Sequence, residues 1–307
     1  MQPYLAPREF VGTPDAMDRQ WSEAESLAYT KWLANHHYEN FHVVSALLPR
    51  HLHQDFYNVY AYCRWADDLA DEMGDREKSL RLLNWWRGQL HRMYAGADSG
   101  HPVFAALRGT VSRHGIPQQP FADLIAAFVQ DQSVTRYDDW AGVLGYCANS
   151  ANPVGRLVLY LCGYSDAERQ ALSDATCTGL QLANFWQDVT VDLQKDRVYL
   201  PLDLLARHNY SVEDLFALRF NAAFRDAMCE AVGYARAFFV RGLPLVGMVN
   251  RRLSLDLDLF SRGGMLILDK IERQDFNVLT ARPKVSKSER VRLLLGAVMR
   301  AAFAKAA

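Results

Sequence analysis

The chain has 307 residues, half of which are hydrophobic, and its formal net charge at pH 7 is −1. A chain of this length and composition can bury a large core, and no low-complexity linker divides it, so we expect a single domain over residues 1–307. Nearly balanced charge without a basic tract excludes an electrostatic nucleic-acid binder, because such proteins usually carry a basic surplus that matches the phosphates.

Cysteine usage and the N-terminal segment indicate a cytoplasmic protein. The cysteines are odd in number and widely spaced, without a CxxC pair for zinc or redox chemistry: Cys63, Cys147, Cys162, Cys177 and Cys229. We therefore expect free thiols, as in a reducing compartment. The N-terminal segment lacks the apolar stretch of a secretory signal, and no run approaches the roughly 20 apolar residues of a transmembrane helix.

Taken in chain order, the sequence predicts an N-terminal arm followed by helices alone. Residues 1–16 contain three prolines and are expected to be extended. Alternating strand patterns and internal repeats are missing, so we predict an all-α fold. Apolar periodicity, prolines and capping residues predict helices over 18–35, a short segment ending at Pro49, 52–72, 76–94, segments from Pro102 to His114 and Pro117 to Ser133, 138–162 with a break at Asn152–Pro153, 165–191 with Ser165 as cap, 202–208, 212–218, 221–241, 244–274 and 286–304.

The predicted helix 52–72 concentrates acidic residues near its end. Asp67 and Asp71, four positions apart, lie on one helical face, and Arg64 and Tyr60 continue that face towards the N-terminus. Apolar residues lie on both sides. We therefore expect a partly buried helix whose carboxylates have no partner on the chain, so that a cation should sit between them.

A second polar stripe recurs in the predicted helix 165–191 and just beyond it. Asn184, Asp188 and Asp192 are spaced by four residues, and Gln181 continues the stripe backwards. Such a stripe beside apolar residues is costly to bury unless it is ligated or hydrogen-bonded. Magnesium prefers oxygen ligands and is typically held by one or two carboxylates together with substrate phosphates. Two such helices facing each other would hold magnesium and, through it, a diphosphate.

Structural interpretations stand beside the functional one. Acidic residues four apart usually mark a solvated helix face, and either stripe taken alone fits that interpretation. Arg64 can also pair with Asp67 or Asp68 and serve structure only. Trp85 and Trp86 are better taken as core residues than as the lining of a substrate tunnel. Two stripes in the same phase, both flanked by core-type residues, favour a site.

Taken together, the motifs resemble the squalene and phytoene synthase family over about residues 30–285. The matching motifs are Tyr60-x-x-Cys-Arg-x-x-Asp-Asp-x-x-Asp-Glu72, Gln181-Leu-x-Asn-x-x-x-Asp-x-x-x-Asp192, Arg197-Val-Tyr-Leu-Pro201 and Tyr146-Cys-x-x-x-Ala-x-x-Val-Gly155. This resemblance implies the all-α class I isoprenoid synthase fold, with a central active-site cavity. It also implies magnesium as cofactor and isoprenyl diphosphates as substrates.

Motif positions also carry the family's roles to this chain. The resemblance implies magnesium ligands at Asp67, Asp71, Asn184, Asp188 and Asp192. It implies diphosphate contacts at Arg64 and Arg197, and active-site polar residues at Tyr60, Gln181 and Tyr199. Aromatic faces can stabilise a passing carbocation, for which the candidates are Phe41, Tyr146, Phe185 and Trp186.

Departures from the family pattern narrow the expected substrate. Where the family has His-Ser-Lys/Arg-Ser-Phe, this chain has His37-Tyr-Glu-Asn-Phe41, so that Glu39 replaces a basic residue. Gln187 and Asp196 likewise replace a typical arginine and a typical glycine. Without these basic residues the chain should bind two diphosphates, each of roughly −3 charge, less well. We therefore expect a substrate with one diphosphate, such as presqualene diphosphate.

Further signatures resemble the bacterial hopanoid-pathway branch, whose members with this pattern make hydroxysqualene. These signatures are Tyr38-Glu-Asn-Phe41, Ser150-Ala-Asn-Pro-Val-Gly-Arg156, Phe185-Trp-Gln-Asp188 and Leu268-Asp-Lys-Ile-Glu272. The implied reaction ionises presqualene diphosphate to a cyclopropylcarbinyl cation, which rearranges and is captured by water. No dinucleotide fingerprint occurs, so we expect no NADPH. The implied pathway neighbours are a presqualene diphosphate synthase and a hydroxysqualene dehydroxylase.

Two other functions stay open from the sequence. The chain could condense two farnesyl or geranylgeranyl diphosphates itself, giving presqualene diphosphate, squalene or phytoene. It could also be a non-catalytic helical partner of another prenyl synthase, although its intact acidic stripes count against this.

The predicted last helix combines basic and apolar residues. Lys287, Arg290, Arg292, Arg300 and Lys305 accompany the apolar residues of 286–304. An ordinary amphipathic packing helix accounts for this pattern, and peripheral membrane contact is the alternative that a lipophilic product suggests.

Overall fold

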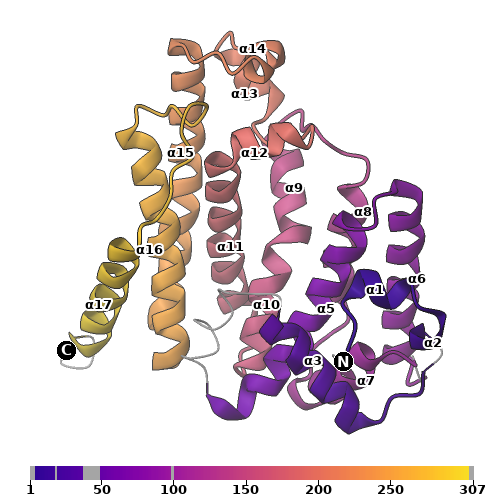
Figure 1. Cartoon of the computed structure of the whole chain (residues 1–307). Helices are drawn as coiled ribbons and strands as arrows, with labels where there is room; N and C mark the ends of the chain where they lie inside the picture. Colours follow the sequence, from indigo (N-terminus) through magenta and orange to yellow (C-terminus); the bar gives the residue numbers. More distant parts are fainter. Residues whose placement is uncertain (1–3, 18, 37–48, 98–99, 304–307) are drawn as a thin grey trace. The chain divides into compact units, whose positions relative to one another are not determined.

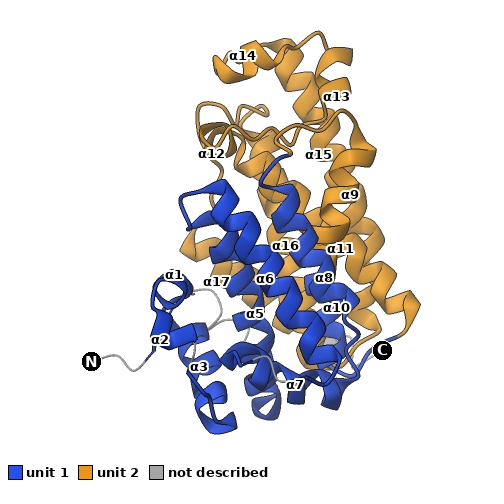
Figure 2. Cartoon of the chain, turned by 90° about the vertical axis from the view of Figure 1, so that its right-hand side faces the viewer, with its two compact units in different colours: residues 1–133, 153–165 blue, residues 134–152, 166–307 orange. Residues whose placement is uncertain are grey.

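The computed structural model describes residues 4–17, 19–36, 49–97 and 100–303. Residues 301–303 are described by their backbone only. Within these ranges the chain forms helices joined by turns and loops, without a strand, which confirms the predicted all-α fold (Figure 1). The chain groups into two compact units (Figure 2). Unit 1 comprises residues 1–133 and 153–165, and unit 2 comprises 134–152 and 166–307. The single domain over 1–307 stays a prediction.

The helices follow the order of the chain. In unit 1 they are α1 (Pro7–Val11), α2 (Pro14–Met17), α3 (Glu23–His36), the 3-10 turn η1 (Arg50–Leu52), α5 (His53–Asp71), α6 (Arg76–Tyr94), α7 (Pro102–His114), α8 (Gln119–Gln130) and, apart from its first residue, α10 (Asn152–Leu161). In unit 2 they are α9 (Trp140–Ser150), α11 (Ala167–Gln187), α12 (Val189–Gln194), α13 (Leu202–Arg207), α14 (Val212–Phe216), α15 (Ala222–Gly242), the 3-10 turn η2 (Leu243–Gly247), α16 (Arg251–Arg273) and α17 (Lys287–Phe303). None of the described helices combines the length and the apolarity that crossing a membrane requires.

The expectation of an extended N-terminal arm over 1–16 is wrong where the structure describes it. Pro7 and Pro14 each begin a short helix, α1 and α2. Proline suits the first helical position, because its fixed φ is already helical and its missing N–H has no partner to lose there. In α8 the first-turn proline is Pro120, and the predicted Pro117 precedes the helix.

Two predicted helices are interrupted. The predicted break at Asn152–Pro153 is confirmed, because α9 ends at Ser150 and α10 begins at Asn152. The expected helix 165–191 is capped by the side chain of Asp166, not by Ser165, and it ends at Gln187. Similarly, the expected helix 244–274 begins only at Arg251, because Pro244 lies in a 3-10 turn and the Asn250 side chain caps α16.

Aromatic rings form the core of unit 1. The rings of Trp65 on α5 and Trp86 on α6 stack at 5.1 Å between centroids, and both side chains are fully buried. The imidazole of His101 contacts both rings edge-on, and burial lowers its pKa to about 3, so that it is neutral at physiological pH. Trp86 is therefore a core residue as predicted, and Trp85 packs partly buried against the same core.

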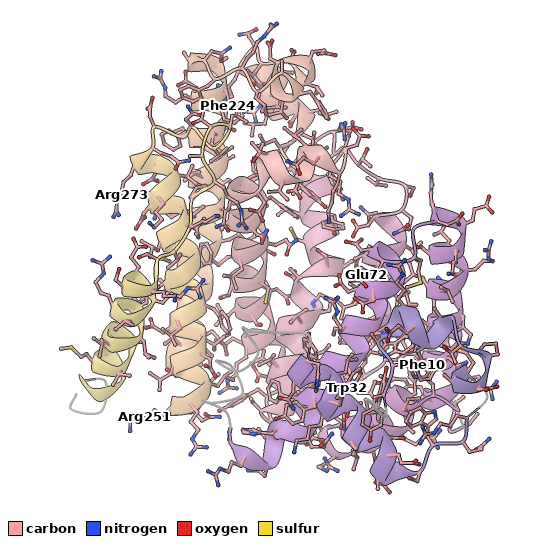
Figure 3. All side chains as sticks on the ribbon, in the orientation of Figure 1. Phe10, Trp32, Glu72, Phe224, Arg251 and Arg273 are labelled. Atoms are coloured by element: carbon pink, nitrogen blue, oxygen red, sulfur yellow. The ribbon has the colours of Figure 1, made fainter. Side chains whose placement is uncertain are left out.

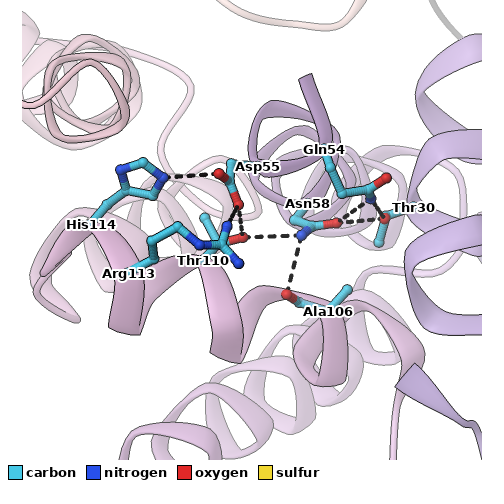
Figure 4. A network of polar contacts seen from close by, with 8 residues as sticks. All are labelled: Thr30, Gln54, Asp55, Asn58, Ala106, Thr110, Arg113 and His114. Carbon is cyan, nitrogen blue, oxygen red and sulfur yellow. Dashed lines mark hydrogen bonds and ion pairs between the residues drawn. The ribbon is translucent and has the colours of Figure 1, made fainter. Parts of the chain in front are cut away.

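A buried polar network orients α5 between α3 and α7 (Figure 4). The Asn58 side chain donates to Thr110 Oγ1 at 3.0 Å and accepts a hydrogen bond from Thr30 Oγ1 at 2.6 Å. One turn earlier, the Asp55 carboxylate accepts from Thr110 Oγ1 at 2.8 Å and pairs with His114 Nε2 at 2.9 Å. Because these buried groups satisfy one another's hydrogen bonds, they define the rotation of α5 about its axis and thereby the direction of its acidic end.

Unit 2 depends on close helix packing at glycines. The buried ring of Phe239 on α15 lies between Gly179 on α11 and Gly264 on α16. A Cβ at Gly179 would lie 3.2 Å from the ring, and one at Gly264 would clash with it. Gly242, at the end of α15, lies against the backbone of α11 at Leu172 and Thr176. Gly179 and Gly264 make room for the Phe239 ring, and Gly242 lets the end of α15 approach the backbone of α11.

A buried carboxyl on α16 makes the stability of unit 2 depend on pH. Asp256 is 5% exposed, its Oδ2 has no hydrogen-bond partner in the described structure, and burial raises its pKa to about 7. The folded protein therefore keeps a proton that the unfolded chain loses near pH 4. Stability should fall as the pH rises from about 4 to about 7, and level off above that.

Asp256→Asn should reduce this slope, to which the raised pKa values of Asp68 and Asp192 also contribute, and should make the protein more stable than the parent at pH 8, by on the order of 1 kcal/mol or more. At pH 4.5 the two proteins should unfold at similar temperatures. Thermal unfolding across pH 4.5–8 measures the effect, with exposed Asp203→Asn as the control. A slope in Asp256→Asn as steep as in the parent would show that Asp256 does not contribute to the pH dependence.

Candidate active site

The first acidic stripe lies on the last two turns of α5, whose C-terminal end is marked by Glu72 in Figure 3. Tyr62, Trp65 and Leu69 point into the core of unit 1, so the opposite side of the helix is left for the polar residues. Asp71 is exposed, and Tyr60 and Asp67 are half-buried.

Arg64 pairs with carboxylates at the end of α5. Its guanidinium pairs with Asp67 at 3.3 Å and Glu72 at 3.1 Å, and it contacts the buried Asp68. Burial raises the pKa of Asp68 to about 7, although Arg64 acts in the opposite direction. The expectation of carboxylates without a partner on the chain is thus wrong, and the alternative pairing of Arg64 is found. One guanidinium reaches three carboxylates because they follow it at three, four and eight positions on the same helix.

The second stripe continues across a break in the helix. Asp188 lies between the last residue of α11 and the first residue of α12. Helical hydrogen bonds nevertheless continue across it: the backbone N–H of Asp188 donates to the Asn184 carbonyl, and the backbone N–H of Asp192 donates to the Asp188 carbonyl, each at 2.9 Å. The four-residue phase of the stripe is therefore kept. Asn184 Nδ2 donates to Asp188 Oδ2 at 3.1 Å. Burial, followed by the nearby charge of Asp188, raises the pKa of Asp192 to about 7.

Arg282, which the sequence analysis missed, binds the centre of this stripe. Its guanidinium forms a two-pronged ion pair with Asp188, with Nη2 at 3.0 Å from Oδ2 and Nε in closer contact with Oδ1. It lies in the segment after α16, 94 positions from Asp188. Arg197 acts on Asp192 electrostatically, and its backbone N–H donates to the Asp192 carbonyl at 2.9 Å.

An aromatic wall stands beside these charges. Phe185 and Tyr199 stack face to face, with centroids 3.7 Å apart and planes 5° apart. The ring centroid of Tyr146 lies 5.7 Å from that of Tyr199, and Tyr137, which was not predicted, also stacks on Tyr199 at 5.8 Å. A small pocket is lined by both Phe185 and Tyr199 together with Asp192 and Arg197. Carboxylate, guanidinium and aromatic faces thus meet in one place within unit 2.

Asp196, which departs from the glycine of the family pattern, has a left-handed backbone conformation. Its φ is 55°, the left-handed region that favours glycine, which explains why a glycine typically occupies this position in similar sequences. Aspartate tolerates this region better than most side chains. Arg136 holds it there by pairing with its carboxylate at 2.5 Å and by donating to its carbonyl.

The structure assigns each predicted residue to a unit. Unit 1 contains Tyr60, Arg64, Asp67 and Asp71, and unit 2 contains Tyr146, Gln181, Asn184, Asp188, Asp192, Arg197 and Tyr199. Gln181 lies half-buried on α11. The His37–Phe41 segment with Glu39 lies outside the described residues.

The available donors fit a hard cation. No group of three or more metal-ligating His, Cys, Asp or Glu side chains occurs among the described residues. Each stripe does offer carboxylate oxygens, and the second stripe adds the amide of Asn184. Two of these carboxylates, Asp188 and Asp192, interact closely enough for one to raise the pKa of the other. Oxygen donors in closely spaced pairs are what magnesium takes when a phosphate completes its coordination.

Comparison with known proteins identifies the family. Residues 34–289 match the squalene/phytoene synthase family. The chain is 33% identical over 268 residues to the phytoene synthase of Thermus thermophilus, covering 87% of this chain and 90% of the relative. It is 35% identical over 246 residues to the hydroxysqualene synthase of Rhodopseudomonas palustris, covering 78% and 82%.

Solved structures agree with the sequence relatives. The crystal structure of a squalene synthase from Alicyclobacillus acidocaldarius superposes with a TM-score of 0.79 at 41% identity, covering 83% of this chain and 96% of that one. This confirms the predicted isoprenoid synthase fold. The chain therefore belongs to the squalene/phytoene synthase family.

Proposed function

We propose that the chain converts presqualene diphosphate and water to hydroxysqualene and diphosphate in a magnesium-dependent reaction. Family membership makes it a synthase that processes prenyl diphosphates. The observation that carries the proposal is the meeting of Asp188 and Asp192 with Arg197, Arg282 and an aromatic wall within unit 2. The similarity to a hydroxysqualene synthase supports the choice of product.

Asp67, Asp71, Asn184, Asp188 and Asp192 would hold the metal. When bound, magnesium neutralises the diphosphate and so makes it a better leaving group. Arg64 and Arg197 would contact the diphosphate oxygens, because guanidinium groups match phosphate geometry. These cations retain the leaving group while the C–O bond breaks and its electron pair departs with the diphosphate.

The aromatic wall would handle the carbocation that remains. The faces of Phe185, Tyr199 and Tyr146 carry partial negative charge and stabilise a cation without bonding to it. The cyclopropylcarbinyl cation rearranges against this wall, and a water molecule then adds its oxygen to the cation and releases a proton. This proposed reaction of presqualene diphosphate with water consumes no reductant, so it requires no NADPH.

The specificity for one diphosphate rests on the sequence around Glu39. A glutamate at a position where similar sequences carry a basic residue repels a second diphosphate. Presqualene diphosphate carries one such group, whereas condensation of two farnesyl diphosphates needs two.

Product analysis tests the proposal directly. Incubation with presqualene diphosphate and magnesium in water labelled with heavy oxygen should give a labelled thirty-carbon alcohol, detected by mass spectrometry. Addition of NADPH should leave this product unchanged. A hydrocarbon product, or no turnover, would contradict the proposal.

A second candidate is the complete condensation of two prenyl diphosphates. It is favoured by the 33% identity with a phytoene synthase over most of both chains. Incubation with farnesyl or geranylgeranyl diphosphate alone separates the two: the condensing enzyme releases diphosphate, and the enzyme proposed first releases none.

Arg282 should compete with the metal for Asp188. Because its guanidinium occupies both carboxylate oxygens, Arg282→Gln should tighten the binding of Mn²⁺, a magnesium substitute, several-fold when diphosphate is absent. Titration followed by electron paramagnetic resonance measures free Mn²⁺. The control is Arg236→Gln, which removes an arginine paired with Asp269 and Glu272. Unchanged or weaker binding in Arg282→Gln would show that this arginine does not compete for the site.

A further inference from the structure

One side of the last helix, α17, packs against α16 (Figure 1). Ala297 is buried on that side, and Leu293 is partly buried. Two ion pairs secure the contact: Lys270 Nζ to Glu289 at 2.9 Å, and Arg300 Nη2 to the Asp258 carboxylate at 2.6 Å. The inner side of α17 is therefore accounted for by packing within unit 2.

The outer side of α17 is apolar and exposed. Five side chains on it are 42–60% exposed, and we call them the outer stripe: Val291, Leu294, Leu295, Val298 and Met299. Their spacing of three, four, seven and eight residues from the first member puts them on one helical face. The packing-helix interpretation accounts for the inner side of α17 and leaves this stripe unexplained. Five neighbouring apolar side chains on one exposed helix are typical of an interaction surface.

Positive charge borders the outer stripe. At about 100° per residue, Arg290 and Arg292 fall on its two edges and Lys287 falls at its N-terminal end. Glu289 is the only acidic residue of α17, and it faces inward, where it pairs with Lys270. The surface therefore offers apolar side chains between cations, with no carboxylate among them.

This charge pattern selects one occupant. A second copy of the chain packed stripe to stripe would bring the bordering arginines of both copies together, and like charges at an interface oppose association. An anionic bilayer instead offers acyl chains to the stripe and phosphates to the arginines, whose long side chains can reach the headgroups. We propose that α17 binds the surface of an anionic lipid bilayer, with the outer stripe at the boundary between headgroups and acyl chains.

Liposome flotation of the full chain tests the proposal. The parent protein should float with vesicles of phosphatidylcholine and phosphatidylglycerol, and much less with phosphatidylcholine alone. Val291→Gln combined with Val298→Gln should lower the bound fraction, with a partition coefficient reduced about tenfold or more, because two inserted side chains become polar. Arg290→Gln combined with Arg292→Gln should remove the preference for anionic vesicles.

The matched control replaces two equally exposed valines elsewhere, Val154 on α10 and Val240 on α15, by glutamine. It should float like the parent. Parent protein that stays unbound with anionic vesicles, or a stripe variant that floats like the control, would overturn the proposal. Sedimentation that shows a dimer in the parent and a monomer in the stripe variant, without flotation, would assign the stripe to a second copy instead. Because the readout is binding, a negative result leaves the proposed reaction untouched.

Discussion

Replacing Asp188 by asparagine should lower the turnover of presqualene diphosphate by roughly 1,000-fold or more, because it removes negative charge from the centre of the proposed metal-binding stripe. The shape of the side chain is kept, so that packing against α11 and α12 is unaffected. The loss of the ion pair with the half-exposed Arg282 should cost at most about 1 kcal/mol. Steady-state kinetics with saturating magnesium measures the effect.

Two measurements separate loss of metal from loss of fold. The far-ultraviolet circular dichroism of Asp188→Asn should match the parent and its thermal midpoint should lie within about 3 °C of it, while its affinity for Mn²⁺ should fall. The control is Asp226→Asn, the same chemical change at a 57% exposed carboxylate on α15, which should retain full activity. Turnover of Asp188→Asn within tenfold of the parent would exclude Asp188 as a metal ligand in the reaction.

The two acidic stripes could be predicted because helical periodicity relates residues within one element. Asn184, Asp188 and Asp192 keep their four-residue phase through backbone hydrogen bonds, even where α11 ends. The same reasoning could not find Arg282, because an arginine in a loop after α16 carries no periodic signal. Its contact with Asp188 depends on how α16 and the loop after it pack in unit 2.

The pairing of Arg64 with Asp67 or Asp68 could be predicted from the sequence only as an alternative to a metal site. Arg64 precedes Asp67, Asp68 and Glu72 on the same helix, at spacings that allow ion pairs. Whether such a helix keeps its carboxylates for a metal or pairs them internally depends on side-chain burial, which periodicity does not reveal. In the structure, the buried Asp68 holds the arginine, and the more exposed Asp67 shares it.

Close packing at glycine is a further feature that composition does not disclose, and it leads to the largest expected effect on stability. In Gly242→Ala, the added methyl would lie 2.9 Å from the Thr176 backbone nitrogen and 3.0 Å from the Leu172 carbonyl oxygen, and would overlap the Thr176 hydroxyl. Because two of these neighbours are backbone atoms of α11, they cannot rotate away. We expect a loss of roughly 2–3 kcal/mol and a thermal midpoint roughly 5 °C lower.

Gly233→Ala, on the same helix, is the matched control. No atom lies within 4 Å of a Cβ at Gly233, and the position is exposed. Alanine favours the helix by about 1 kcal/mol over glycine, so this variant should melt at the parental temperature or slightly above it. A lower thermal midpoint in Gly242→Ala and an unchanged or higher one in Gly233→Ala would show that the contact between α15 and α11 causes the loss of stability. If Gly242→Ala, like Gly233→Ala, melts at or slightly above the parental temperature, the close approach at Gly242 does not limit stability.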